Sequence, residues 1–178
     1  MDGYHYFRRE LDAMTDPAEA YRRQVLRGAH FTFNAEKFVR DVVAARSSGH
    51  GKFPSFDHAA KDPVEDDIEV QKDHRVVLVE GLYVALSIEP WYALSALASV
   101  FDETWLVSCD ADAAAARLVA RHVATGIGGD REMAEKRVHS NDGPNGRFLL
   151  SHLRPVDLEV PSVAAGESGG DDDGGEGC

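Results

Sequence analysis

Two carboxylates in this sequence stand where the ends of buried strands are expected. Asp2 lies in the first segment, Met1–Tyr6, which is typical of a strand end that runs into an acidic, aromatic loop. Glu80 directly follows the short apolar run Arg75–Val79 and precedes Gly81. Such a run is typical of a buried parallel strand, and open α/β sheets bind ligands at the carboxyl ends of their strands. Asp2 and Glu80 together therefore predict a metal and phosphate site at one edge of a sheet.

Each of these acids also has an ordinary structural interpretation. Asp2 is then a terminal residue in solvent, and Glu80 is a strand-end acid that a neighbouring helix N-terminus satisfies. Gly81 favours the functional interpretation of Glu80, because a glycine lets the backbone approach a ligand closely.

A pair of arginines indicates a second charged group. Arg117 and Arg121 are four residues apart in an alanine-rich segment that follows the capping residue Asp110. Residues at this spacing share one face of a helix. Two guanidinium groups on one face suit a triphosphate, and the alternative is a solvated basic stripe.

The order of the predicted elements indicates an α/β fold. Caps, glycines and apolar periodicity predict helices over 16–27, 34–46, 89–98, 111–125 and 130–139. Apolar runs predict buried strands over 75–79 and 104–109 and a short strand over 148–150, with an extended surface segment at 52–68 and a turn at 141–145. Alternating strands and helices imply a parallel sheet flanked by helices, and Trp91, Trp105, Phe101 and Phe38 are predicted to lie in its core.

Composition separates a globular body from an acidic end. The chain has 178 residues, a net charge of -12 and 43% apolar residues. Residues 164–178 are rich in glycine and acid and contain no large apolar residue, so a disordered tail is predicted after a domain that spans 1–163.

The acidic balance argues against nucleic acid as a partner. No apolar stretch approaches a membrane span and no secretory pattern begins the chain, so a cytoplasmic protein is expected.

Six segments, taken in order, resemble one known family. They are Met1–His5 (similar to MDGFH), Arg27–Asn34 (similar to RRGAPFTFD), 54–67, Val79–Tyr83, Arg117–His122 and Asn141–Asn145 (similar to NDxPN). Together they resemble the uridine kinase and phosphoribulokinase group of P-loop kinases, in particular its fungal and bacterial nucleoside- or pantothenate-kinase-like members. The resemblance covers about residues 1–160.

The resemblance implies a function and a role for each candidate residue. The fold would be a P-loop NTPase-type parallel sheet flanked by helices, and the cofactors would be ATP and Mg²⁺. Asp2 would accept the proton of the acceptor hydroxyl and would hold Mg²⁺ together with Glu80. The remaining roles fall to the acceptor-binding residues Tyr4, His5, Arg8, Asp57 and His58 and to the phosphate-binding residues Arg117 and Arg121. For the acceptor residues the alternative is ordinary surface-loop chemistry, and for Asp57 a turn carboxylate.

One family feature has no counterpart in the sequence. The phosphate loop requires G-x-x-x-x-G-K-[ST], whereas the single Gly-Lys pair, Gly51–Lys52, is preceded by Arg46 at the first glycine position and followed by Phe53. The resemblance therefore implies an incomplete fold that lacks the first strand, the phosphate loop and the first helix, with impaired activity. The missing strand would lie between segments 75–79 and 104–109, leaving apolar edges exposed. A non-catalytic binding module, a gene-model fragment and a homo-oligomer are the alternatives.

Overall fold

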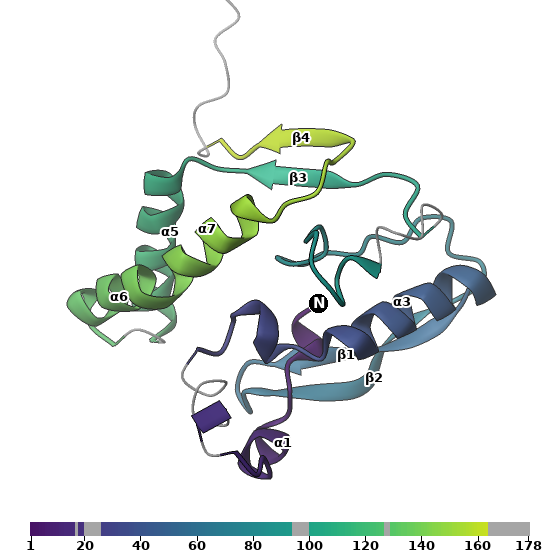
Figure 1. Cartoon of the computed structure of the whole chain (residues 1–178), viewed down its shortest axis with the longest axis horizontal. Helices are drawn as coiled ribbons and strands as arrows, with labels where there is room; N and C mark the ends of the chain where they lie inside the picture. The colour runs from purple at the N-terminus through teal and green to yellow at the C-terminus, as the bar shows by residue number, and fades with distance from the viewer. Residues whose placement is uncertain (17, 20–25, 94–99, 127–128, 164–178) are drawn as a thin grey trace, which may run out of the picture.

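The computed structural model describes residues 1–16, 18–19, 26–93, 100–126 and 129–163 (Figure 1). The predicted helices over 16–27 and 89–98 lie largely outside these residues, and the predicted tail 164–178 lies wholly outside them. None of the helices among the described residues is long and apolar enough to cross a membrane.

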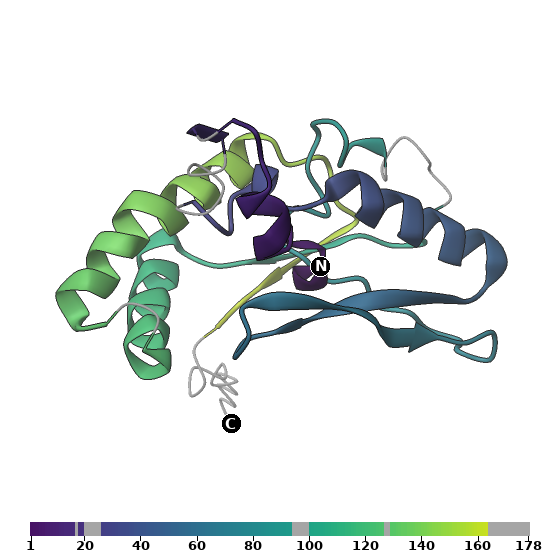
Figure 2. The same cartoon turned by 90° about the horizontal axis from the view of Figure 1, so that it is seen from below.

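An antiparallel hairpin and a helix form one part of the molecule. Strands β1 (Gly51–Asp57) and β2 (Asp62–Val70) pair over the segment that the sequence predicts only as extended surface chain. Helix α3 (Ala35–Ser48) lies along this hairpin (Figures 1 and 2). As predicted, α3 begins at Asn34, whose side chain accepts the Lys37 N–H at 3.0 Å, and it ends at Gly49, whose φ of 74° suits glycine.

The N-terminal segment runs between this part and the rest of the chain. It consists of the 3₁₀ turn η1 (Asp2–Tyr4) and the short helix α1 (Arg8–Asp12), and a second 3₁₀ turn, η2 (His30–Thr32), lies beside it. Tyr4 accepts the N–H of Asn34 at 2.7 Å, and Tyr6 donates to Thr32 at 3.2 Å. Figures 1 and 2 both show the N-terminus near the middle of the molecule.

A small parallel sheet flanked by helices forms the other part. Strand β3 (Trp105–Ser108) pairs in parallel with β4 (Leu158–Pro161). The crossover between them contains α5 (Ala111–Thr125), α6 (Arg131–Arg137), the π-helical turn η3 (Val138–Asp142) and α7 (Gly143–Ser151). The α/β fold predicted from the sequence is confirmed.

Aromatic and leucine side chains join the two parts in one core. Trp91, Tyr83 and Leu86 are fully buried, and Phe33 and Phe38 pack against Trp91 with ring centroids 6.3 and 5.6 Å away. The predicted core positions of Trp91 and Phe38 are confirmed. Phe101 is half-buried against the same core.

The strand prediction for Arg75–Val79 is wrong. The segment is irregular, and Val76 and Leu78 are 77% and 89% exposed. An apolar run becomes a buried strand only where neighbouring strands accept its hydrogen bonds, and no described strand pairs with it. The strand over 104–109 is confirmed as β3, but its predicted burial and the core position of Trp105 are not, because Trp105 and Val107 are 61% and 69% exposed.

Two predictions near the C-terminal end of the crossover are also wrong. Asn141–Asn145 is helical rather than a turn, because Pro144 occupies the first turn of α7, where a missing N–H costs little. Phe148–Leu150 belongs to α7 and not to a strand. Short apolar runs do not distinguish a strand from a buried helix face, and Leu149 is the buried residue of this helix.

Candidate functional site

The backbones of the two predicted catalytic acids lie next to each other. The terminal amino group of Met1 donates to the Glu80 carbonyl at 2.8 Å, so Asp2 is one residue away from a direct contact with Glu80. Gly81 makes this approach feasible, because a Cβ at this position would lie 2.4 Å from the Met1 side chain. Met1 and Glu80, which are 79 positions apart in the sequence, are thus in contact.

The carboxylates of Asp2 and Glu80 supply two of the oxygen ligands that Mg²⁺ needs. Asp2 and Glu80 are exposed, and neither carboxylate is engaged by another described residue. Within the described part of the chain no group of three or more His, Cys, Asp or Glu side chains could hold a metal ion. Mg²⁺ commonly uses one or two carboxylates together with water and the phosphates of a substrate. Asp2 and Glu80 are thus of the residue type that would hold Mg²⁺ arriving with a nucleotide.

Tyr4 lies in the core and not in a solvent-facing loop. It is 4% exposed, and its hydroxyl donates to Asp41 at 3.1 Å. Burial, followed by the Asp41 carboxylate, raises the pKa of Tyr4. Lys37 lies 4.9 Å above the Tyr4 ring and forms ion pairs with Asp41 at 3.0 Å and Glu65 at 3.1 Å. Burial lowers the pKa of Lys37, but the hydrogen bonds to these two acids outweigh it and raise that pKa overall.

His5 occupies a half-buried position beside Asp2. Its Nδ1 lies 2.8 Å from the Asp2 carbonyl, to which it donates as N–H, and its ring packs 4.0 Å from Phe33 and 5.1 Å from Phe56. Burial is the main cause that lowers the pKa of His5. A neutral ring whose Nδ1 carries the hydrogen keeps Nε2 as a proton acceptor.

A hollow of about 200 Å³ opens next to these side chains. We call it the N-terminal hollow. It is lined by residues of the N-terminal segment, the start of α3 and β2: Gly3, Tyr4, His5, Phe7, Arg9, Glu10, Asn34, Lys37 and Glu65. Two of the predicted acceptor residues, Tyr4 and His5, line it, whereas Lys37 and Glu65 were not predicted from the sequence. The i,i+4 spacing of Lys37 and Asp41 was the available signal for that charge cluster.

The other predicted acceptor residues lie around the tip of the hairpin. Asp57 accepts the N–H groups of Ala59 and Ala60 at 2.7 and 3.0 Å, and these bonds lower its pKa. Its carboxylate is thus engaged as a turn carboxylate, the alternative left open above. His58 is exposed and contacts the Phe56 ring edge-on at 5.2 Å.

Backbone and guanidinium contacts fasten this tip to the N-terminal segment. The Arg8 N–H donates to Asp62 at 2.9 Å, while the Arg8 side chain is exposed. Arg27 donates to the carbonyls of Lys61 at 2.7 Å and Tyr6 at 3.1 Å. Arg27 belongs to the RRGAPFTFD-like segment, but the sequence did not indicate its role as a clamp.

The predicted phosphate-binding arginines lie on α5, at the end of the molecule away from the N-terminus (Figures 1 and 2). Both are exposed, and Arg117 donates to the Ser162 hydroxyl at 2.9 Å. Among the described residues, no contact joins them to Asp2 or Glu80. The structure thus places Glu80 against Met1, the residue before Asp2, and leaves the two arginines in a separate group.

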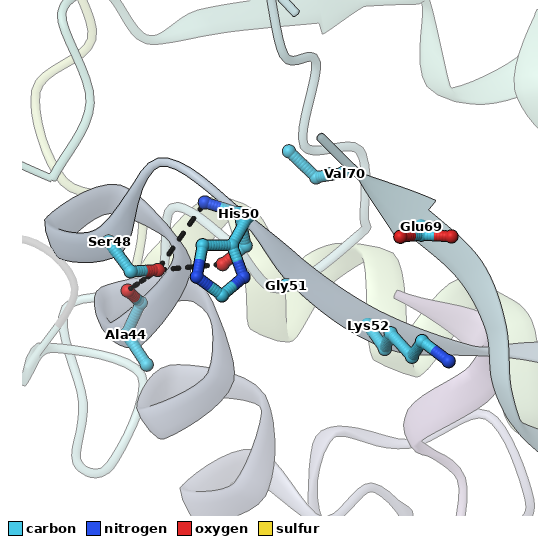
Figure 3. A pocket seen from close by; sticks show the side chains of 7 residues that line it. All are labelled: Ala44, Ser48, His50, Gly51, Lys52, Glu69 and Val70. Carbon is cyan, nitrogen blue, oxygen red and sulfur yellow. Dashed lines mark hydrogen bonds between the residues drawn. The ribbon is translucent and has the colours of Figure 1, made fainter. Parts of the chain in front are cut away.

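The Gly51–Lys52 pair has a different setting from a phosphate loop. It lies at a junction from helix to strand, where α3 ends and β1 begins, whereas a phosphate loop connects a strand to a helix. Figure 3 shows the shallow pocket of about 460 Å³ at this junction, lined by Ala44, Ser48, His50, Gly51, Lys52, Glu69 and Val70. The Ser48 hydroxyl is engaged there by the Ala44 and His50 carbonyls at 2.8 and 2.7 Å. The pocket contains none of the predicted site residues.

The NDxPN-like segment fastens the crossover helices. The Nε2 atom of the buried His122 lies 2.7 Å from Asp142, and this contact joins α5 to η3. Asn141, also buried, donates to the Arg27 carbonyl at 3.5 Å and accepts from Asn145 at 3.3 Å. The sequence singled out this segment but assigned its residues no role.

Comparisons with known proteins identify relatives over most of the chain. The ATP-dependent kinase-like protein notR' of Aspergillus versicolor is 46% identical over 166 residues, which are 90% of this chain and 93% of that protein. A protein of Schizosaccharomyces pombe named as a candidate uridine kinase is 34% identical, over 92% of this chain and 68% of its own length. No protein-family model matches.

The chain belongs to this kinase-like family.

Solved structures agree with the family assignment. A candidate fructose transport system kinase from Silicibacter sp. TM1040 superposes with a TM-score of 0.78 at 29% identity, over 90% of this chain and 72% of that one. YFH7 of Saccharomyces cerevisiae, described as a P-loop containing kinase with a circular permutation, gives a TM-score of 0.75 at 29% identity. This member of the kinase-like family spans 56% of the YFH7 chain.

Proposed function

We propose that the chain binds ATP with Mg²⁺ and transfers the γ-phosphoryl group to a hydroxyl of a small molecule of the nucleoside, sugar or pantothenate class. Asp2 accepts the proton of the attacking hydroxyl, and Glu80 holds the metal that accompanies the nucleotide. The contact between Met1 and the Glu80 carbonyl carries this proposal, because Asp2 directly follows Met1 in the chain. The names of the relatives, ATP-dependent kinase-like protein and uridine kinase, support it.

The N-terminal hollow supports the acceptor side of the proposal. Its lining combines the half-buried His5 with the charged pair of Lys37 and Glu65, so polar groups are available for a hydroxylated ligand. Its volume of about 200 Å³ suits the reacting part of a small acceptor and not a macromolecule.

Activity is proposed to be weak. Phosphoryl transfer depends on positioning and on charge stabilisation, to which the backbone N–H groups and the lysine of the phosphate loop contribute. The sequence contains no G-x-x-x-x-G-K-[ST]. The proposed transfer therefore rests on Asp2 and Glu80.

A second candidate function is a non-catalytic interaction module. The exposed apolar residues Val76, Leu78, Trp105 and Val107 favour it, since such surface is common at protein interfaces. Under this alternative the family fold is retained as a scaffold, and binding of a protein partner replaces turnover.

Thermal denaturation in the presence of nucleotide separates the two functions. Mg-ATP at ten times its Kd is expected to stabilise the chain by about 1.4 kcal/mol, which raises the Tm by about 3–6 °C. Mg²⁺ alone should cause no shift, because the described residues form no metal cage. Asp2→Asn and Glu80→Gln should reduce the Mg-ATP shift to that of ATP without metal, whereas Glu132→Gln on α6 should leave it unchanged.

Turnover is then measured as ADP release with a nucleoside, a sugar and pantothenate as acceptors. A slow release that depends on one acceptor class and is lost in Asp2→Asn supports the transferase. Absence of both the thermal shift and the acceptor-dependent release would contradict it and leave the interaction module.

A further inference from the structure

The end of β4 is fastened directly to the arginine-bearing helix. The Ser162 N–H donates to the Ser108 carbonyl at 2.7 Å, and its hydroxyl accepts from Arg117 Nη1 at 2.9 Å. The chain therefore leaves the sheet within hydrogen-bonding distance of Arg117. Figure 1 shows β4 ending beside the start of α5.

Arg117 and Arg121 form an exposed positive face, which we call the α5 arginine face. Arg121 lies about 6 Å further along the helix axis. Neither guanidinium forms an ion pair with another described residue, and Arg117 uses only Nη1 for Ser162. Both side chains are exposed, so their remaining N–H groups are available to donate to an anionic partner.

The sequence that follows Val163 carries only negative charge. Residues 164–178 contain the acids Glu167, Asp171, Asp172, Asp173 and Glu176 and no Lys, Arg or His. Asp171 is eight residues after Val163. Eight residues span at most about 26–29 Å, which is long enough for these carboxylates to be brought to Arg117 and Arg121.

We propose that residues 164–178 bind back onto the α5 arginine face through their carboxylates. A single exposed ion pair contributes little to stability. Here, however, several carboxylates follow Ser162 in the same chain, and this covalent connection raises their effective concentration at the α5 arginine face. The contact is consequently reversible, sensitive to salt and open to displacement by a more highly charged anion.

The contact also implies a form of control, and this part rests on the proposed function. If Arg117 and Arg121 receive the nucleotide phosphates, residues 164–178 compete with them for the same guanidinium groups. A triphosphate carries more charge on fewer atoms than a carboxylate series, so Mg-ATP displaces the segment, whereas nucleotides with fewer phosphates do so less well.

The two cysteines allow a direct test on the full chain. Cys109 is exposed, so Cys109→Ser leaves Cys178, the last residue, as the single site for a spin label. We expect the amide signals of α5 around Arg117 and Arg121 to broaden at low salt and to sharpen in about 0.5 M NaCl.

Three variants provide the comparison. Broadening should be lost when the segment is neutralised and when Arg117 and Arg121 are changed to Gln. It should persist in Arg131→Gln with Lys136→Gln, which removes the same charge from α6. The neutralised segment carries five substitutions: Glu167→Gln, Asp171→Asn, Asp172→Asn, Asp173→Asn and Glu176→Gln. Equal broadening with the acidic and the neutralised segments overturns the proposal.

A mixed sample and two anions complete the test. Broadening in isotope-labelled chains mixed with spin-labelled, isotope-free chains would assign the segment to a second copy and overturn the intramolecular contact. Tripolyphosphate should sharpen the α5 signals. The variant with the neutralised segment should bind Mg-ATP several-fold more tightly than the wild type at low salt. Segment binding without any effect of Mg-ATP would support the contact and contradict the phosphate role of the arginines, so the two proposals fail separately.

Discussion

At the scale of single residues, His5 shows how a polar side chain is held beside the candidate site. Its ring lies between Phe33 and Phe56 and donates to the Asp2 carbonyl, so its position depends on one hydrogen bond and two apolar contacts. This environment favours the neutral ring and lowers the pKa of His5, with burial as the main cause.

The lowered pKa of His5 predicts a pH dependence of stability. In the unfolded chain the pKa of histidine is about 6.5, so in the window just below this value the unfolded state binds more protons than the folded state. The contribution of neutral His5 is therefore present above pH 6.5 and is lost as the pH falls towards the folded value. Denaturant unfolding between pH 7 and pH 5 should show a smaller loss of stability in His5→Asn than in the wild type.

His58→Asn is the matched control, because His58 belongs to the exposed hairpin tip. It should follow the wild-type pH profile. A wild-type profile that coincides with that of His5→Asn would contradict the role assigned to burial.

At the scale of elements, the closest approach occurs between η1 and β1. A Cβ on Gly3 would lie 2.0 Å from the Pro54 carbonyl oxygen and 2.4 Å from its carbon, so backbone would have to move. Gly3→Ala should lower the free energy of unfolding by about 1–3 kcal/mol, as measured by urea denaturation. Because η1 would leave the hairpin, the N-terminal hollow should be lost with it.

Gly146→Ala in α7 is the control for this substitution. Nothing lies within 4 Å of the added Cβ, and alanine is the better helix former, so this variant should gain about 0.5–1 kcal/mol. A neutral effect of Gly3→Ala would show that η1 does not pack on β1.

Helix starts were predictable from the sequence, whereas of the predicted strands only the one over 104–109 was found, as β3. Asp110 and Asn34 cap α5 and α3 as predicted, because a cap is a local hydrogen bond between a side chain and nearby N–H groups. The run Arg75–Val79 has the composition of a buried strand but remains exposed, since strand formation depends on partners elsewhere in the chain. Local signals therefore located the helices, and tertiary context decided the strands.

The candidate site, like the fold, was predictable from the sequence only in part. A shared site for Asp2 and Glu80 was inferred from two expected strand ends, but neither segment is a strand: Asp2 begins the 3₁₀ turn η1, and Arg75–Val79 is irregular. The spacing of Lys37 and Asp41 signalled their pairing on α3, whereas Glu65 lies on β2 and could be recognised as their partner only after the hairpin had been placed beside the helix. Its role depends on packing between elements, which residue spacing alone does not specify.

At the scale of the whole molecule, the exposed apolar surface is unevenly distributed. Strand β3 pairs only with β4 among the described strands, and its residues Trp105 and Val107 are exposed. The segment with Val76 and Leu78 is exposed as well. An unpaired apolar edge is a template for association, so we expect the chain to self-associate as its concentration rises.

A charge on this edge should suppress the association. Val107→Lys places an ammonium group at a position that is 69% exposed, where it does not disturb the core but must be desolvated in any edge-to-edge pairing. Sedimentation velocity over a concentration series should show a shift towards monomer relative to the wild type. Val64→Lys makes the same change of charge on β2, at a position that is 41% exposed in a paired hairpin, and should leave the association unchanged. The two variants have equal net charge, so a difference in their association shows an effect of the β3 edge and not of general charge repulsion. A wild-type chain that stays monomeric throughout the concentration series would exclude this edge as an interface.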